Sequence, residues 1–293
     1  MSLRTVDVHG RKVALAEAGE KHGHDTPIVY LHGFADIHGV AGDFMPFHQR
    51  LAKHAKVIAP AHPGCNGSDE LDACSIDDVI FHYLELFDTE FLPRFDLVGH
   101  CVGGWIAAEF AVRHPERVAR LTLIGASGLF VPGEPIGDIF MHAQPERGTD
   151  LSSLRAMLFA EPDGALAKRW FPDGRGDMDE ELRRYQTLRF GSFVGFKPPY
   201  FYHRELRERL HRAWMPSLVV WGENDRMTPP AHGAAYYDDL YGADELKVID
   251  GAGHAVHVEH PERVADAILE FRARHPDELG EMQDVDERPS PSS

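Results

Sequence analysis

The architecture of this chain follows from one segment, Phe95-Asp96-Leu97-Val98-Gly99-His100-Cys101-Val102-Gly103-Gly104. Its apolar start is typical of a buried strand, and the Ala-rich residues 105–112 predict a helix. A strand that runs straight into a helix needs a sharp turn, which strains the backbone of the central residue, Cys101. The positions two before and two after it crowd one another, and Gly99 and Gly103 fill them. We therefore expect Cys101 to lie at a helix N-terminus, where the helix dipole stabilises a thiolate.

Two further predicted strands are followed by loops that carry an acid and a histidine. Residues 218–221 lead into Gly222-Glu223-Asn224-Asp225, and residues 246–249 lead into Asp250-Gly251-Ala252-Gly253-His254. Sites in open parallel sheets form outside the carboxyl ends of the strands. The sequence thus predicts a nucleophile, an acid and a base in the order Cys101, Asp225 and His254. Three alternatives stay open: Glu223 as the acid, and His257 or His260 as the base.

Short apolar runs alternate with helical patterns along most of the chain. This alternation predicts an α/β fold with a mainly parallel central sheet flanked by helices. The expected strands are 28–31, 57–59, 95–98, 121–124, 218–221 and 246–249. The expected helices are 76–91, 105–112 and 261–271.

The alternation stops between residues 132 and 214, where strand-like runs are missing and 151–159 and 180–189 look helical. We expect a core of residues 1–131 and 215–275, interrupted by a helical cap at 132–214. The cap's aromatic and arginine residues could line a substrate pocket or form the cap's own core and surface: Phe190, Phe193, Phe196, Tyr200, Tyr202, Arg184 and Arg189. Residues 276–293 are acidic and end in Pro-Ser-Pro-Ser-Ser, which predicts a disordered tail.

Composition excludes several classes of protein. The chain has 293 residues with 43% hydrophobic and 26% charged, which is ordinary for a globular protein. A formal charge of −17 disfavours binding to nucleic acid, which requires a basic face. Three cysteines, a small and odd number, disfavour a fold that is held together by disulfide bonds. Because neither an apolar leader nor a membrane-length segment is visible, we expect a cytoplasmic protein with no membrane partner.

These motifs together resemble the α/β-hydrolase superfamily over nearly the whole chain, to about His275. The nucleophile turn matches at 99–103, the strand-then-His-Gly segment at 31–34, the glycine-rich loop at 63–69, the acid loop at 222–225 and the Gly-x-Gly-His segment at 251–254. The resemblance implies a sheet of about eight strands and a cap insertion. One departure matters: the family usually has Ser, or Asp in dehalogenases and epoxide hydrolases, where this chain has Cys101. Without Asp, an alkyl-enzyme ester cannot form.

The resemblance also implies a function. By analogy with the family, the backbone N–H groups of Phe34 and Val102 form the oxyanion hole, while His254, oriented by Asp225, activates Cys101. We expect hydrolysis of a carboxylic ester, a lactone or a thioester through an acyl thioester, with a small acyl compound as the partner. Acyl transfer and C–C bond hydrolysis of β-diketone-like substrates are alternatives, as is a ligand-binding homologue without activity. The oligomeric state stays open.

The remaining cysteines and histidines carry weaker signals. Cys65 lies in the glycine-rich loop, and we expect Cys74 to be structural or exposed. The spacing of the two cysteines would permit a disulfide bond between them in an oxidising compartment. His32 is expected to pack under the oxyanion loop. We expect neither a cofactor nor a metal, because none of the 19 histidines has a partner at zinc-type spacing along the chain.

Overall fold

The computed structural model describes residues 2–20, 25–72, 75–143, 151–174, 176–196 and 199–277. An eight-stranded sheet in the order β1-β2-β4-β3-β5-β6-β7-β8 crosses the molecule. The strands are β1 (Ser2–Val8), β2 (Arg11–Ala18), β3 (Ile28–Leu31), β4 (Val57–Pro60), β5 (Phe95–His100), β6 (Val118–Ile124), β7 (Ser217–Gly222) and β8 (Ala243–Ile249). From β4 to β8 every pairing is parallel, whereas β2 pairs antiparallel with both β1 and β4.

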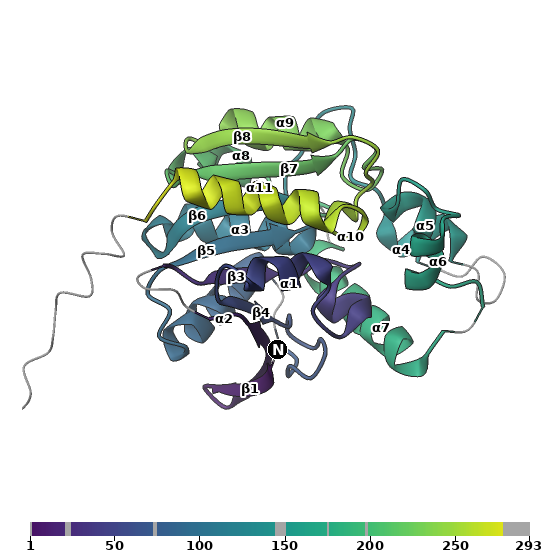
Figure 1. The fold of residues 1–293 in the computed structure, drawn as a ribbon, viewed down its shortest axis with the longest axis horizontal. Helices are drawn as coiled ribbons and strands as arrows, with labels where there is room; N and C mark the ends of the chain where they lie inside the picture. Colours follow the sequence, from purple (N-terminus) through teal and green to yellow (C-terminus); the bar gives the residue numbers. More distant parts are fainter. Residues whose placement is uncertain are drawn as a thin grey trace, which may run out of the picture.

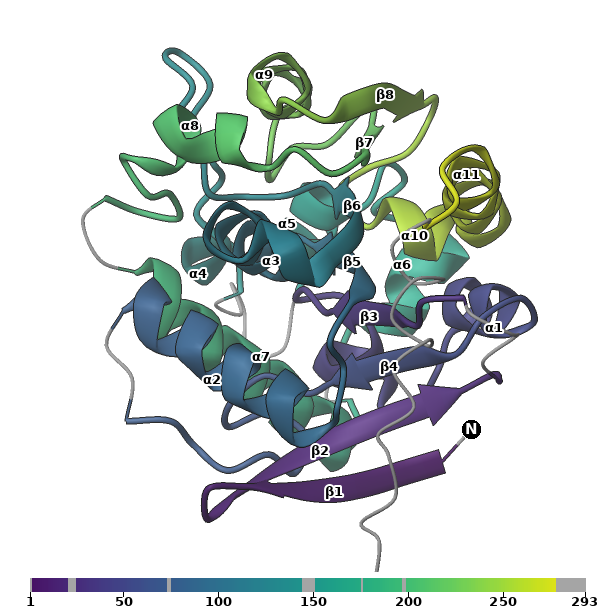
Figure 2. The same cartoon turned by 90° about the vertical axis from the view of Figure 1, so that its left-hand side faces the viewer.

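Helices cover both faces of the sheet. Viewed along the sheet, one layer lies on each side of it (Figure 2). The first layer contains α2 (Ile76–Thr89), α3 (Val102–Arg113), α8 (Leu206–Arg209) and α9 (Pro230–Asp239), and the second contains α1 (Pro46–Ala52), α10 (Val256–Glu259) and α11 (Pro261–Arg274). Strand β5 is buried along its whole length, which explains its continuous apolar run.

The six strands predicted from apolar runs are confirmed, with ends that differ by three residues or fewer. The hairpin of β1 and β2 was not predicted, because neither strand is buried along its length and neither has a continuous apolar run. Its signal was weak but present: His9 and Gly10 both adopt positive φ and close the turn.

The segment between β6 and β7 is helical in the residues that the structure describes. It holds α4 (Ile139–His142), α5 (Ser152–Leu158), α6 (Ala165–Trp170) and α7 (Met178–Gly195), which gather at one end of the sheet (Figure 1). The later α8 and a short 3-10 turn, η3 (Leu210–Arg212), pack instead against α3 of the core. None of the described helices is long and apolar enough to span a bilayer.

Of the predicted tail at 276–293, residues 278–293 lie outside the described part of the chain. Asp277 is described, and its carboxylate accepts a hydrogen bond from Arg94 Nε at 3.0 Å.

Candidate active site

Cys101 occupies the turn between β5 and α3. Its backbone has φ 55° and ψ −118°, in the left-handed half of conformational space that a non-glycine residue rarely adopts. The turn is held on both sides of the residue. Its N–H donates to Ile124 O at 3.0 Å, and its carbonyl accepts from Trp105 N at 3.1 Å, which opens the helix. The side chain is fully buried, with Sγ 4.0 Å from Met227 Sδ.

Three glycines make this turn sterically possible. A Cβ on Gly99 would lie 2.3 Å from Gly103 O, and one on Gly103 would lie 2.2 Å from Leu31 O. On Gly33, after β3, a Cβ would lie 2.8 Å from Cys101 Cβ. Each added methyl would overlap atoms that cannot move freely. The loop after β3 therefore packs directly against the cysteine.

The structure brings Asp225 and His254 together at the neighbouring strand ends. His254 Nδ1 lies 2.8 Å from Asp225 Oδ2, and both side chains are fully buried. Asp225 Oδ1 accepts from Met227 N at 2.9 Å and Thr228 N at 2.7 Å, which fixes the carboxylate. Gly125, at φ 50°, leaves room for this pair, because a Cβ there would lie 3.3 Å from both partner atoms.

The electrostatics of His254 favour its charged form. Burial lowers the pKa of His254, but the negative charges of Asp225 and Cys101 outweigh that effect and raise it to about 10. The second ring nitrogen, Nε2, is buried and has no hydrogen-bond partner among the described residues. His254 can therefore hold a proton beside a thiolate and deliver it through Nε2.

The two amides proposed for the oxyanion hole lie on the segments that flank Cys101. Val102 is the first residue of α3, and Phe34 follows the Gly33 that packs against Cys101. Neither N–H donates a hydrogen bond within the described parts of the chain. Both donors are thus free to bind a developing negative charge.

Aromatic side chains pack around Phe34, on the loop that contacts Cys101. The ring of Phe34 touches Gly191 of α7 so closely that a Cβ there would lie 2.6 Å from the ring. Phe201 packs edge-on to Phe34 with ring centroids 6.2 Å apart, and Phe140 stacks on Phe201 at 5.5 Å. Sequence reasoning missed Phe140 and Phe201, because nothing in their local sequence indicates that they pack with Phe34.

The predicted cap residues divide between the interior and the surface. Phe190 is buried and stacks on His62 with ring centroids 4.4 Å apart, whereas Phe193, Phe196 and Tyr200 are exposed. The two arginines lie over rings of the insertion itself: Arg184 over Phe171 and Arg189 over Phe193.

The competing candidates from the sequence lie elsewhere. Glu223 accepts from Gly251 N at 3.0 Å and is exposed, so Asp225 is the acid that reaches His254. His260, an alternative for the base, is the residue directly before α11. His32 packs under the loop after β3 as expected, with Nδ1 3.1 Å from Gly33 O. Cys65 is a buried free thiol, while Cys74 lies outside the described residues.

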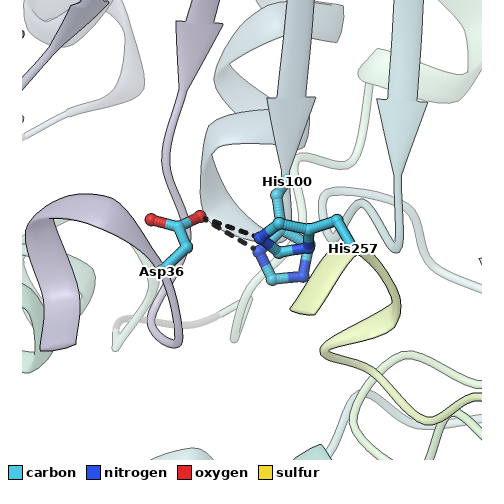
Figure 3. A group of neighbouring side chains, drawn as sticks. All are labelled: Asp36, His100 and His257. Carbon is cyan, nitrogen blue, oxygen red and sulfur yellow. Dashed lines mark ion pairs between the residues drawn. The ribbon is translucent and has the colours of Figure 1, made fainter. Parts of the chain in front are cut away.

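His257 belongs to a second buried cluster that the sequence did not indicate. Asp36, His100 and His257 point toward one another from three separate segments (Figure 3). Asp36 Oδ2 lies 3.4 Å from His100 Nδ1 and 3.6 Å from His257 Nε2. Because these residues are far apart along the chain, a search for ligand spacing could not bring them together.

Comparison with known proteins agrees with this geometry. Residues 26–261 match the family model described as alpha/beta hydrolase fold. The chain belongs to that family.

Two relatives and one solved structure illustrate the range of this α/β hydrolase family. The chain is 30% identical over 279 residues to a dihydrolipoyllysine-residue acetyltransferase component of an acetoin cleaving system from Pseudomonas putida, covering 92% of this chain and 69% of that protein. It is 29% identical over 300 residues to a 2-hydroxy-6-oxononadienedioate/2-hydroxy-6-oxononatrienedioate hydrolase from Burkholderia vietnamiensis, covering 93% and 98%. It also resembles the structure of a serine hydrolase from Cycloclasticus zankles, with a TM-score of 0.74, 21% identity and coverage of 94% and 99%.

Proposed function

We propose that this α/β hydrolase cleaves a carboxylic ester, a lactone or a thioester, with Cys101 as its nucleophile. The observation that carries the proposal is the position of Cys101 at a left-handed turn before α3, at the same sheet edge as the buried His254–Asp225 pair. A reactive thiol, a polarised base and free amide donors are the groups that acyl transfer to cysteine requires.

The chemistry follows from these groups. The Cys101 thiolate attacks the carbonyl carbon, and the oxyanion is bound by the N–H groups of Phe34 and Val102. His254 then protonates the leaving group as the bond to the acyl carbon breaks. The acyl group remains on Cys101 Sγ as a thioester. His254 next takes a proton from water, whose oxygen attacks the thioester, and the acid leaves as the thiolate re-forms.

The surroundings of Cys101 favour an apolar acyl group. Met227 Sδ lies 4.0 Å from Cys101 Sγ, and Phe34, whose ring packs against Phe201, follows the glycine that packs against Cys101. An apolar pocket stabilises a hydrocarbon by burying its surface but offers a carboxylate or a phosphate no partner.

A second candidate function is hydrolysis of a C–C bond beside a carbonyl group. The Burkholderia vietnamiensis relative named for such a hydrolase matches this chain over 98% of its own length, so the two share an end-to-end organisation. A substrate of that class is expected to give products without a stable acyl adduct on Cys101.

Product analysis tests the proposal. The purified chain is incubated with p-nitrophenyl esters, acyl thioesters and a β-diketone-like compound, with and without added alcohols or thiols. Hydrolysis of an ester or thioester that disappears in Cys101→Ala and persists in Cys65→Ala supports the proposal. The matched control removes a buried thiol whose pKa burial raises to about 12, outside the triad.

The outcomes separate the candidates. Products that incorporate the added alcohol or thiol favour acyl transfer, and cleavage of the β-diketone-like compound alone favours C–C hydrolysis. Turnover unchanged in Cys101→Ala, or no turnover of any substrate, contradicts the proposal.

A further inference from the structure

We propose that Asp36, His100 and His257 form a structural binding site for a divalent first-row metal ion, with zinc the best match. The site lies beneath the triad, and the inference does not depend on the proposed function. The three side chains are fully buried and converge on one point (Figure 3).

The distances match the edges of a metal coordination polyhedron. A zinc ion about 2.0–2.1 Å from each ligand in a tetrahedron places neighbouring ligand atoms about 3.3 Å apart. Asp36 Oδ2 lies 3.4 Å from His100 Nδ1 and 3.6 Å from His257 Nε2. The hydroxyl group of Tyr30 borders the cluster, with its oxygen 2.7 Å from Asp36 Oδ2 and 3.3 Å from His257 Nε2. Two imidazoles and a carboxylate are ligands that zinc accepts.

The tautomer of His100 leaves a lone pair directed at Asp36. His100 Nε2 lies 3.1 Å from the backbone carbonyl of His254, which can only accept, so Nε2 carries the hydrogen. Nδ1 of the neutral ring is then an electron-pair donor that faces a carboxylate oxygen, and it has no hydrogen-bond partner among the described residues. A nitrogen lone pair and a carboxylate oxygen repel each other at this distance, and a cation between them makes the arrangement stable. An imidazole that donates its other N–H to a carbonyl is also the usual arrangement of a metal ligand.

The negative charge of the Asp36 carboxylate also favours a bound cation. The side chain of Asp36 is fully buried. The ion-pair partners of Asp36 in the described chain are histidines, at 3.4 to 3.9 Å, and none is Lys or Arg. A buried anion without a cationic partner is costly, and a bound metal ion removes that cost.

The second shell and an access route are also present. Asp36 Oδ2 accepts from Gly33 N at 2.8 Å, and Tyr30 donates to the same oxygen. His257 lines a cavity of about 420 Å³ between the insertion and the core. A bound ion would connect the loop after β3, the end of β5 and α10. Phe34 lies in the first of these segments, Cys101 directly follows the second, and His254 lies two residues before the third.

Metal analysis of the purified full chain tests the inference. The protein is stripped with a chelator, reloaded with zinc or cobalt(II), and freed of excess metal by gel filtration. We expect retention of about one ion per chain, a higher melting temperature with zinc, and visible d–d absorption with cobalt(II). Asp36→Asn and His257→Gln should lose the retained ion and the thermal shift.

Two control variants locate the ion. Cys101→Ala and Asp225→Asn change the triad but leave the three proposed ligands, so both should retain the metal, and the cobalt(II) spectrum should lack a sulfur charge-transfer band. If Asp36→Asn does not fold, the metal content of His257→Gln and the zinc-dependent melting temperature of the unmodified chain still test the inference. No retained metal in the unmodified chain, or metal lost from the triad variants and kept in Asp36→Asn or His257→Gln, overturns the inference.

Discussion

Cys101 owes its proposed reactivity to neighbours that act on a single sulfur atom. The left-handed backbone at φ 55° turns the residue out of β5 at the start of α3. His254 lies at the same sheet edge with its pKa raised to about 10 by Asp225 and Cys101 against the effect of burial. Cys65, also buried, lacks such a partner, and burial raises its pKa to about 12. The two thiols therefore differ in the side chains that surround them.

The first prediction concerns this charge pair. Because the charge of Asp225 is the leading cause that raises the pKa of His254, Asp225→Asn should lower that pKa from about 10 toward the ordinary value of about 6.5. NMR titration of the His254 imidazole in both proteins measures this change. We also expect turnover to fall on the order of 10⁴-fold. Equal titration midpoints in both proteins would contradict the electrostatic account.

At the residue scale, the local sequence indicated the proposed nucleophile, acid and base, but it did not indicate the residues that surround them. Cys101, Asp225 and His254 each follow a predicted strand in a glycine-containing segment, so their common edge could be inferred. Asp36 and His257 could not be placed, because their contacts depend on how three loops meet in space.

The elements around the site meet through small residues. Helix α7 approaches the loop after β3 at Gly191, where the ring of Phe34 fits against the helix backbone. Sequence patterns predicted a helix at 180–189, and the structure extends it to Met178–Gly195. Its low amphipathicity hides which face packs on the core, so the contact with Phe34 was beyond prediction.

The second prediction tests that contact. In Gly191→Ala, the added methyl would lie 2.6 Å from Phe34 ring carbons, so the ring or α7 must shift. Overpacking of this kind costs about 1–3 kcal/mol and should displace the Phe34 amide. We expect a lower melting temperature and a reduced kcat/KM. Ser192→Ala, the next residue of the same helix, is the control and should change neither. Identical behaviour of the two variants would show that α7 does not constrain the loop.

The whole molecule encloses an unusual number of buried neutral histidines. His48, His62 and His100 are fully buried, and burial lowers the pKa of each to about 3. Each ring is neutral in the folded chain at neutral pH but binds a proton after unfolding, where its pKa is about 6.5. The stability that these residues contribute is therefore present above pH 6.5 and is lost as the pH falls from about 6.5 toward 3.

The third prediction follows from that linkage. Three such histidines give a free energy of unfolding that falls by up to about 4 kcal/mol per pH unit in this window. Denaturant unfolding at a series of pH values measures the slope. His48→Gln removes one of the protons taken up on unfolding, so its slope should be smaller by about 1.4 kcal/mol per pH unit. A stability that does not change between pH 6 and 4 would contradict the buried neutral state.

The α/β architecture was accessible from sequence because parallel strands leave continuous apolar runs, as in residues 95–98 and 218–221. The β1–β2 hairpin was not, since neither of its strands has a continuous apolar run. The cap boundary at 214 stays a prediction; of the elements before it, α8 packs on α3 of the core.

The central proposal, that Cys101 carries the acyl group, has a direct measurement. Intact-protein mass spectrometry after rapid acid quench of the chain mixed with an ester or thioester substrate detects a covalent intermediate. We predict a transient mass increase equal to one acyl group, mapped by peptide analysis to Cys101 and absent in Cys101→Ala. Turnover of the same substrate with no acyl adduct at any time, or with an adduct on a residue other than Cys101, would contradict it.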